Sequence, residues 1–156
     1  MEVAAAAEAG AHEIDVVIRR EWALLGRWDE LYREVRAFRE AAGEAHLKVI
    51  LGTGDLADLN QVARAALTSM MAGADFVKTS TGFGPSGATL QDIQLMRETV
   101  GPSMGIKAAG GIRDGQVDRV QQQRSHLAHG RHGVHKTVED QVRPARVDTE
   151  AVAEHV

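Results

Sequence analysis

Residues 73–82 read Gly-Ala-Asp-Phe-Val-Lys-Thr-Ser-Thr-Gly, and the fold prediction starts from this stretch. The segment Phe76–Ser80 has the length and composition of a β-strand, and glycines bound it on both sides. Strands that are covered on both faces normally consist of apolar residues. Lys78 lies in the middle of this one, so we expect it to have a chemical role.

Strand and helix patterns alternate along the first 113 residues. Besides Phe76–Ser80, strands are predicted at His12–Ile18, Leu47–Leu51 and Gly105–Ala109, and helices at Glu2–Glu8, Trp28–Ala42, Leu59–Ala72 and Leu90–Val100. This alternation predicts four βα units and a parallel sheet. On pattern alone a doubly wound sheet and part of a (β/α)8 barrel both remain open. The chain has 156 residues, fewer than the roughly 250 of a complete barrel.

Each predicted strand carries one ionisable side chain that is expensive to bury without a partner. The four residues are Asp15, Lys48, Lys78 and Lys107. A lysine of this kind can reach a strand end and form an ion pair there, which would be a purely structural role. Four such strands together favour a barrel enzyme, because barrel enzymes collect catalytic groups from several strands.

Amine catalysis is the chemistry that suits this set. A protonated lysine cannot attack a carbonyl, but desolvation and a second cation nearby both favour the neutral amine. Lys78 is therefore predicted to form a Schiff base, with Lys107 as the second cation on a neighbouring strand. Asp15 is predicted to balance the charge and to transfer protons, directly or through water.

Composition restricts the remaining classes of function. The formal net charge of −4 gives no reason to expect nucleic acid or an anionic membrane as a partner. The absence of cysteine excludes disulfides and zinc–thiolate sites. Neither a signal peptide nor an apolar run long enough to cross a membrane is found, so we expect a cytoplasmic protein.

The composition changes at about residue 113. Residues 114–156 lack Ile, Phe, Met, Trp and Tyr, so they offer little apolar surface to offset the entropy of ordering. We therefore predict a domain over residues 1–113 and a divergent tail over 114–156 that is disordered, irregular or weakly helical. Four histidines of the tail recur at every third position, namely His126, His129, His132 and His135. Metal binding by this set is not favoured, because the spacing drifts around a helix and no carboxylate completes a site.

Several segments together resemble the deoxyribose-phosphate aldolase family. They are Glu13–Ile18, Leu47–Ile50, Gly73–Gly82 and Gly105–Arg113, and they occur in the family's order over about residues 2–113. The most specific parts are Lys-Thr-Ser-Thr-Gly at 78–82 and Lys-Ala-Ala-Gly-Gly-Ile-Arg at 107–113. The resemblance implies an α/β fold, an incomplete (β/α)8 TIM barrel with about four βα units that correspond to strands four to seven.

The resemblance also implies a reaction and a set of site residues. The reaction is the reversible cleavage of 2-deoxy-D-ribose 5-phosphate to acetaldehyde and D-glyceraldehyde 3-phosphate, without metal or cofactor. Lys78 matches the Schiff-base lysine, Lys107 the second lysine and Asp15 the proton-transfer aspartate. The matches expected to bind substrate or phosphate are Thr81, Gly110, Gly111 and the site-lining Lys48. Gly110-Gly111 alone would be a weak signal, since such a pair more often marks only a tight turn.

Two further questions stay open at this level. The partners expected are a phosphorylated sugar and an aldehyde, and a homo-oligomer is an open alternative to a monomer. The other hypothesis for the whole chain is an inactive truncated fragment or gene-model artefact of this aldolase, which keeps the motifs without catalysis as an isolated chain.

Overall fold

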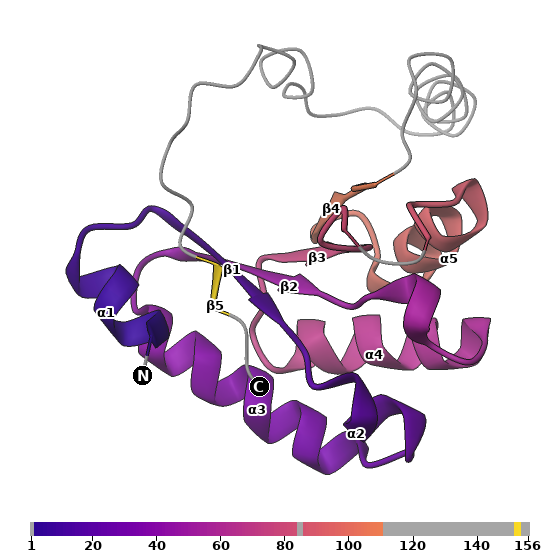
Figure 1. Ribbon diagram of the computed structural model, residues 1–156, viewed down its shortest axis with the longest axis horizontal. Helices are drawn as coiled ribbons and strands as arrows, with labels where there is room; N and C mark the ends of the chain where they lie inside the picture. Colours follow the sequence, from indigo (N-terminus) through magenta and orange to yellow (C-terminus); the bar gives the residue numbers. More distant parts are fainter. Residues whose placement is uncertain (1, 84–85, 111–151, 154–156) are drawn as a thin grey trace, which may run out of the picture. The chain divides into compact units, whose positions relative to one another are not determined.

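A computed structural model describes residues 2–83, 86–110 and 152–153 (Figure 1). Its helices are α1 (Glu2–Glu8), α2 (Arg20–Leu24), α3 (Trp28–Ala42), α4 (Leu59–Met71) and α5 (Leu90–Val100), with a 3-10 turn, η1, at Thr53–Asp55. Its strands are β1 (Glu13–Val17), β2 (His46–Ile50), β3 (Phe76–Lys78), β4 (Gly105–Lys107) and β5 (Val152–Ala153). Within these residues, no helix has the length and apolar character needed to cross a membrane.

The strands form one parallel sheet in the order β4-β3-β2-β1-β5. Successive strands from β1 to β4 lie next to each other, each joined to the next through at least one helix (Figure 1). This is the βα arrangement that the sequence predicts, and it corresponds to part of a TIM barrel.

One face of the sheet forms the hydrophobic core. Alternate residues of β1 to β3 point to it, and their exposure is 0 or 1%: Ile14, Val16, Leu47, Val49 and Val77. Helix α3 packs on this face because its apolar residues recur at helical spacing, with Leu31, Val35, Phe38 and Ala42 buried. The core therefore lies between the sheet and the helices that connect its strands.

The predicted elements agree closely with those observed. Helices α3 and α5 have the predicted bounds, and Asp58 caps α4 by accepting a hydrogen bond from the Gln61 backbone N–H at 2.9 Å. The strands end earlier than predicted, because Thr79 and the residues after it turn into a loop held by side-chain hydrogen bonds. The short helix α2 and the turn η1 were not predicted.

The predicted tail is almost entirely outside the described residues. Only β5, a two-residue strand parallel to β1, is described there, and the sequence did not predict it. The proposed boundary near residue 113 and the irregular or weakly helical character of the remaining tail stay predictions, as does the interpretation of its four histidines.

Candidate active site

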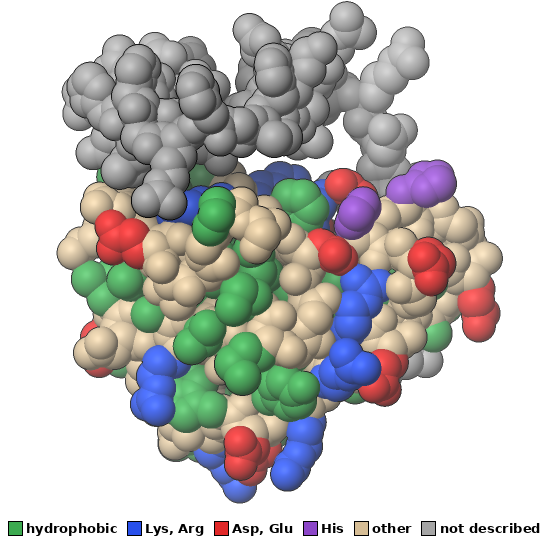
Figure 2. Space-filling view, turned by 180° about the vertical axis from the view of Figure 1, so that it is seen from behind, with side chains coloured by type: hydrophobic (Ala, Val, Ile, Leu, Met, Phe, Trp, Pro, Cys, Tyr) green, Lys and Arg blue, Asp and Glu red, His purple; other side chains and the backbone are tan. Residues whose placement is uncertain are grey.

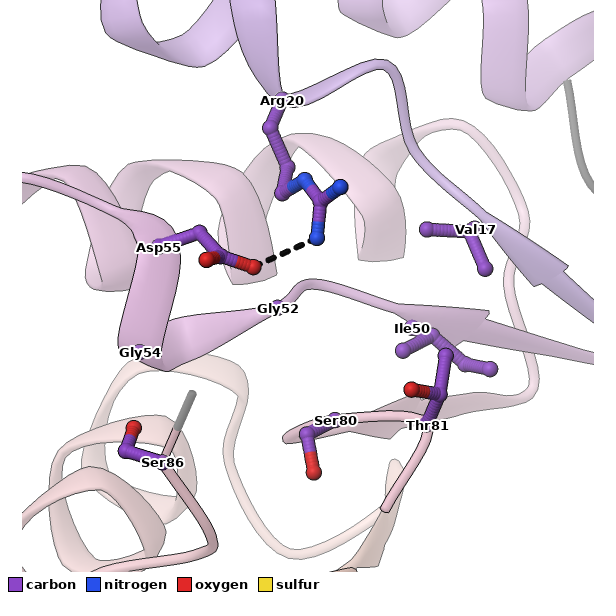
Figure 3. A pocket seen from close by; sticks show the side chains of 9 residues that line it. All are labelled: Val17, Arg20, Ile50, Gly52, Gly54, Asp55, Ser80, Thr81 and Ser86. Atoms are coloured by element: carbon purple, nitrogen blue, oxygen red, sulfur yellow. Dashed lines mark hydrogen bonds and ion pairs between the residues drawn. The ribbon is translucent and has the colours of Figure 1, made fainter. Parts of the chain in front are cut away.

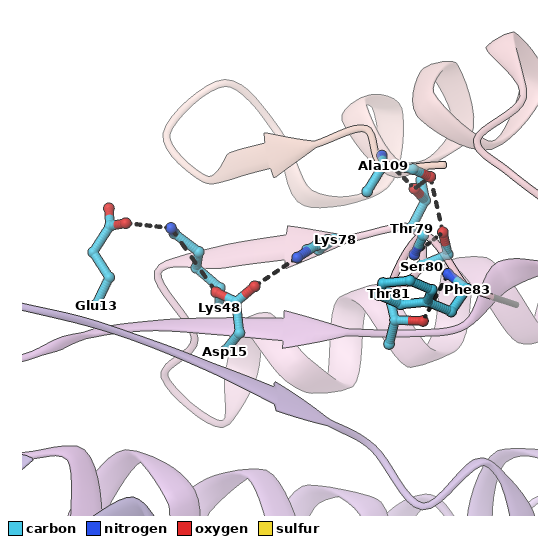
Figure 4. Close-up of polar contacts among 10 residues, drawn as sticks. Glu13, Asp15, Lys48, Lys78, Thr79, Ser80, Thr81, Phe83 and Ala109 are labelled. Atoms are coloured by element: carbon cyan, nitrogen blue, oxygen red, sulfur yellow. Dashed lines mark hydrogen bonds and ion pairs between the residues drawn. The ribbon is translucent and has the colours of Figure 1, made fainter. Parts of the chain in front are cut away.

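A row of charged side chains, buried except at its Glu13 end, crosses the face of the sheet opposite to the core (Figure 4). Lys78 Nζ donates a hydrogen bond to Asp15 Oδ2 at 2.6 Å, and the two residues are 8% and 5% exposed. Lys48 Nζ, from the strand between them, lies 3.9 Å from Asp15 Oδ1. Lys48 also donates a hydrogen bond to Glu13, the first residue of β1. The charges thus alternate in sign along this row, as burial of ions requires.

Strand register explains why these side chains meet. Asp15 pairs with Lys48 across β1 and β2, whereas Lys78 pairs with Lys107 across β3 and β4. Because side chains alternate between faces with a period of two, all four share one face. Lys107 is half-buried, and within the described residues its amine has neither a hydrogen bond nor an ion pair.

The aromatic ring of Phe76 lies at the amino-terminal end of the strands, beside Lys48. Phe76 is level with Lys48 and with Gly105, and Lys48 Nζ lies 5.9 Å from the centre of its ring. A Cβ atom on Gly105 would lie 2.0 Å from a Phe76 ring carbon, so only glycine fits there. The Lys48 ammonium lies over the Phe76 ring within the range of a cation–π interaction.

Hydrogen bonds connect the loops that follow β3 and β4. The Ala109 carbonyl accepts hydrogen bonds from the hydroxyls of Thr79 and Ser80, at 3.1 and 2.8 Å, and from the Ala88 backbone N–H at 3.1 Å. Gly110 has a φ of +80°, and a Cβ on it would lie 2.9 Å from Ser80 Oγ. These contacts fix the segments that directly follow Lys78 and Lys107.

A pocket lies at the carboxyl ends of β1, β2 and β3, where barrel enzymes place their substrates (Figure 3). Its lining consists of Val17, Arg20, Ile50, Gly52, Gly54, Asp55, Ser80, Thr81 and Ser86. Ile50 pairs with Lys78 in the sheet, so the pocket adjoins the layer that contains the amine. Arg20 forms a 2.5 Å ion pair with Asp55 across it, which joins the loops after β1 and β2.

The structure thus brings Asp15, Lys48 and Lys78 into one ion-paired row, and Lys107 into register beside it. Thr81 lines the pocket, and Gly110 packs against the loop after β3, whereas Gly111 lies outside the described residues. Sequence reasoning did not select Glu13, Arg20 or Asp55. Glu13 could have been found, because it stands two residues before Asp15 and therefore on the same face.

Comparisons with known proteins identify the family of the chain. The sequence model of the DeoC/LacD family aldolases matches residues 1–136. The chain belongs to this aldolase family. The family match extends past the change in composition at about residue 113, where the recognisable motifs end.

Individual relatives are described as deoxyribose-phosphate aldolases. The chain is 49% identical to human deoxyribose-phosphate aldolase over 119 residues, which are 72% of this chain and 37% of the human protein. A structure described as a candidate deoxyribose-phosphate aldolase from Coccidioides immitis superposes with a TM-score of 0.70 and 36% identity, covering 79% of this chain and 49% of that one. The tetrameric deoxyribose phosphate aldolase from Aeropyrum pernix superposes with a TM-score of 0.63 and 36% identity, covering 76% and 49%.

The chain spans 37 to 51% of the length of the first curated relatives that it matches. The family match and the similarity to solved structures confirm three predictions: the family, the aldolase (lyase) class of its members and the partial TIM-barrel fold.

Proposed function

We propose that this chain carries the Schiff-base site of a class I aldolase that reversibly cleaves 2-deoxy-D-ribose 5-phosphate to acetaldehyde and D-glyceraldehyde 3-phosphate. The observation that supports this most directly is the buried pair of Lys78 and Asp15, with 2.6 Å between the amine and the carboxylate. An amine nucleophile with an adjacent proton acceptor is what imine formation requires.

The chemistry starts with proton transfer from the Lys78 ammonium to Asp15. The neutral amine then attacks the aldehyde carbon of the open-chain sugar, and the carbonyl oxygen takes up a proton to form a carbinolamine. Loss of this oxygen as water leaves a protonated imine. When the C2–C3 bond breaks, its electron pair moves toward the imine nitrogen and forms an enamine, while a base removes the proton of the C3 hydroxyl. Protonation of C2 and hydrolysis then release acetaldehyde and restore Lys78.

The other site residues have supporting roles in this proposal. Lys107, level with Lys78 on the next strand, favours the neutral amine through its like charge. Thr81 contacts the substrate from the pocket lining. Gly110 and Gly111 receive the phosphate, because backbone N–H groups after a late barrel strand suit an anion. Lys48 lines the site without a catalytic step of its own.

Reductive trapping tests the proposal. The chain contains four lysines, Lys48, Lys78, Lys107 and Lys136, so an adduct is easily mapped. Incubation with acetaldehyde and borohydride should leave an N-ethyl group on Lys78, located by peptide mass spectrometry. Lys136, outside the predicted strands, serves as the internal reference for unselective alkylation. Equal labelling of Lys78 and Lys136 in the folded chain would contradict the proposed function.

The second candidate is a chain with no catalysis when isolated. The observation in its favour is that the chain spans about half of its structural relatives, so that part of their barrel has no counterpart in it. Trapping at Lys78 without turnover of 2-deoxyribose 5-phosphate would support this candidate over the complete reaction. The cytoplasmic location and the absence of nucleic-acid and membrane partners stay sequence-based predictions.

Assembly is a separate part of the proposal. The relative from Aeropyrum pernix is described as tetrameric, and on this ground we expect a homo-oligomer. Light scattering coupled to size-exclusion chromatography measures the mass directly, and a monomer at all protein concentrations would contradict this expectation.

A further inference from the structure

We propose that Glu13 is a positioning residue. Its carboxylate forms an ion pair with the Lys48 ammonium, so that the Asp15 carboxylate stays paired with Lys78. This inference rests on the proposed Schiff-base function and assigns a role to a residue outside its catalytic set. Glu13 begins β1 at the end of the strands opposite to the substrate pocket, so it has no contact with the reacting atoms.

The geometry shows two ammonium groups that can compete for one carboxylate. Lys48 and Lys78 both point toward Asp15, with Nζ–O distances of 3.9 and 2.6 Å (Figure 4). The Lys48 side chain is 6% exposed, so water does little to stabilise its charge. A buried ammonium in this position requires a carboxylate partner. Glu13 is that partner, because the Lys48 amine donates a hydrogen bond to its carboxylate.

Among the described residues, the only carboxylates within reach of Lys48 are those of Glu13 and Asp15. Lys48 lies beside Asp15 on β2, Lys78 follows on β3, and Lys107 is level with Lys78 on β4. The neighbour of Lys48 on β3 is Phe76, whose ring cannot replace a carboxylate as a partner for a buried cation. Without the charge of Glu13, the Lys48 ammonium therefore has Asp15 as its only carboxylate within reach among the described residues.

Loss of Glu13 should accordingly disturb the reaction through Lys48. The Lys48 ammonium would move toward Asp15 and draw its carboxylate away from Lys78. Asp15 would then be less able to transfer protons between Lys78 and the carbinolamine. A structural ion pair at a strand end would have a different signature, because its loss would lower stability without altering the chemistry of the folded molecules.

A double-mutant cycle separates these roles. We expect Glu13→Gln to lower the rate of acetaldehyde trapping at Lys78 by about tenfold per folded molecule. This is smaller than the full contribution of general acid–base catalysis, because Asp15 is still present. In a Lys48→Met background, whose own rate serves as the baseline, Glu13→Gln should have less than about a twofold further effect. Equal effects of Glu13→Gln in both backgrounds, or none in either, would overturn the inference.

The matched control is Glu40→Gln, which removes a carboxylate from the exposed Arg36–Glu40 pair on α3. Its trapping rate should equal that of the original chain. Thermal unfolding of each variant supplies the folded fraction, so that a loss of stability is not counted as a loss of chemistry.

A second measurement is independent of the proposed function. Trace acetylation reports how readily each lysine amine reacts without any turnover, with Lys136 as the reference. In Glu13→Gln, Lys78 should be acetylated faster, because its ion pair with Asp15 is weakened. The double variant Glu13→Gln, Lys48→Met should match Lys48→Met alone. If acetylation of Lys78 follows these two expectations while the original chain traps no acetaldehyde, the aldolase proposal is refuted and this inference is kept. Unchanged acetylation of Lys78 would refute the inference.

Discussion

The two faces of the sheet are built from the same strands, yet they differ completely in chemistry. On the core face, Leu47 and Val49 are 0% exposed and belong to the hydrophobic core. On the other face, Lys48 stands between them in sequence and takes part in the charged row with Asp15 and Lys78. A shift of one residue separates the face that stabilises the fold from the face proposed to carry out catalysis, because the strand period is two.

Because of this difference, we expect substitutions on the two faces to affect different properties of the protein. Asp15, Lys48 and Lys78 on the site face depend on shared ion pairs, so each change there should alter chemistry more than stability. Apolar residues on the core face should alter stability without altering the chemistry of the molecules that remain folded. The following predictions test this separation.

The largest effect is expected from Lys78→Met on the site face. Trapping of acetaldehyde at position 78 and any aldolase turnover should be lost, because Lys78 is the proposed nucleophile and its amine contacts Asp15 at 2.6 Å in the layer next to the pocket. Lys136→Met is the matched control and should keep trapping intact. Mass spectrometry and a coupled assay for glyceraldehyde 3-phosphate measure both outcomes, and turnover surviving in Lys78→Met would assign the Schiff base to another lysine.

Leu47→Ala should have the next largest effect, on the core face. Truncation of this fully buried side chain leaves a cavity and should lower the free energy of unfolding by about 3 kcal/mol. Urea unfolding followed by circular dichroism measures the loss. If trapping per folded molecule also fell strongly, the separation between the faces would be wrong.

Lys107→Met should have an intermediate effect that depends on pH. Removal of the second cation beside Lys78 takes away a like charge that favours the neutral amine, so trapping at neutral pH should fall about tenfold. The rate should recover as the pH is raised, because the amine then loses its proton without help. A pH profile of trapping identical to that of the original chain would remove Lys107 from the proposal.

The smallest effect is expected from Asp58→Ala, which lies away from both faces. Loss of the cap on α4 should lower the free energy of unfolding by about 1 kcal/mol and leave trapping unchanged. Asp58→Asn, which keeps a capping oxygen, is the control and should recover most of the stability. Thermal unfolding of the two variants measures the difference.

Much of the fold could be predicted from local patterns. Helix α3 has apolar residues at helical spacing and a glycine after its last residue, and its bounds were predicted correctly. The four strands were found from their apolar residues, and Asp58 from its place before α4. Helix α2 was missed because it has only five residues, too few for a periodic pattern. The strand ends were overestimated because Thr79 and Ser80 make side-chain hydrogen bonds to a distant loop.

The sequence by itself determined the family, the parallel βα order and the choice of Lys78, Lys107 and Asp15, because these depend on residue type and spacing along the chain. Only the tertiary structure decided which charges form pairs. Glu13, Lys48, Asp15 and Lys78 come from three strands, and their order in space depends on strand register. Register is set by packing between elements far apart in the sequence. The proposed role of Glu13 could therefore be inferred only once β1, β2 and β3 were side by side.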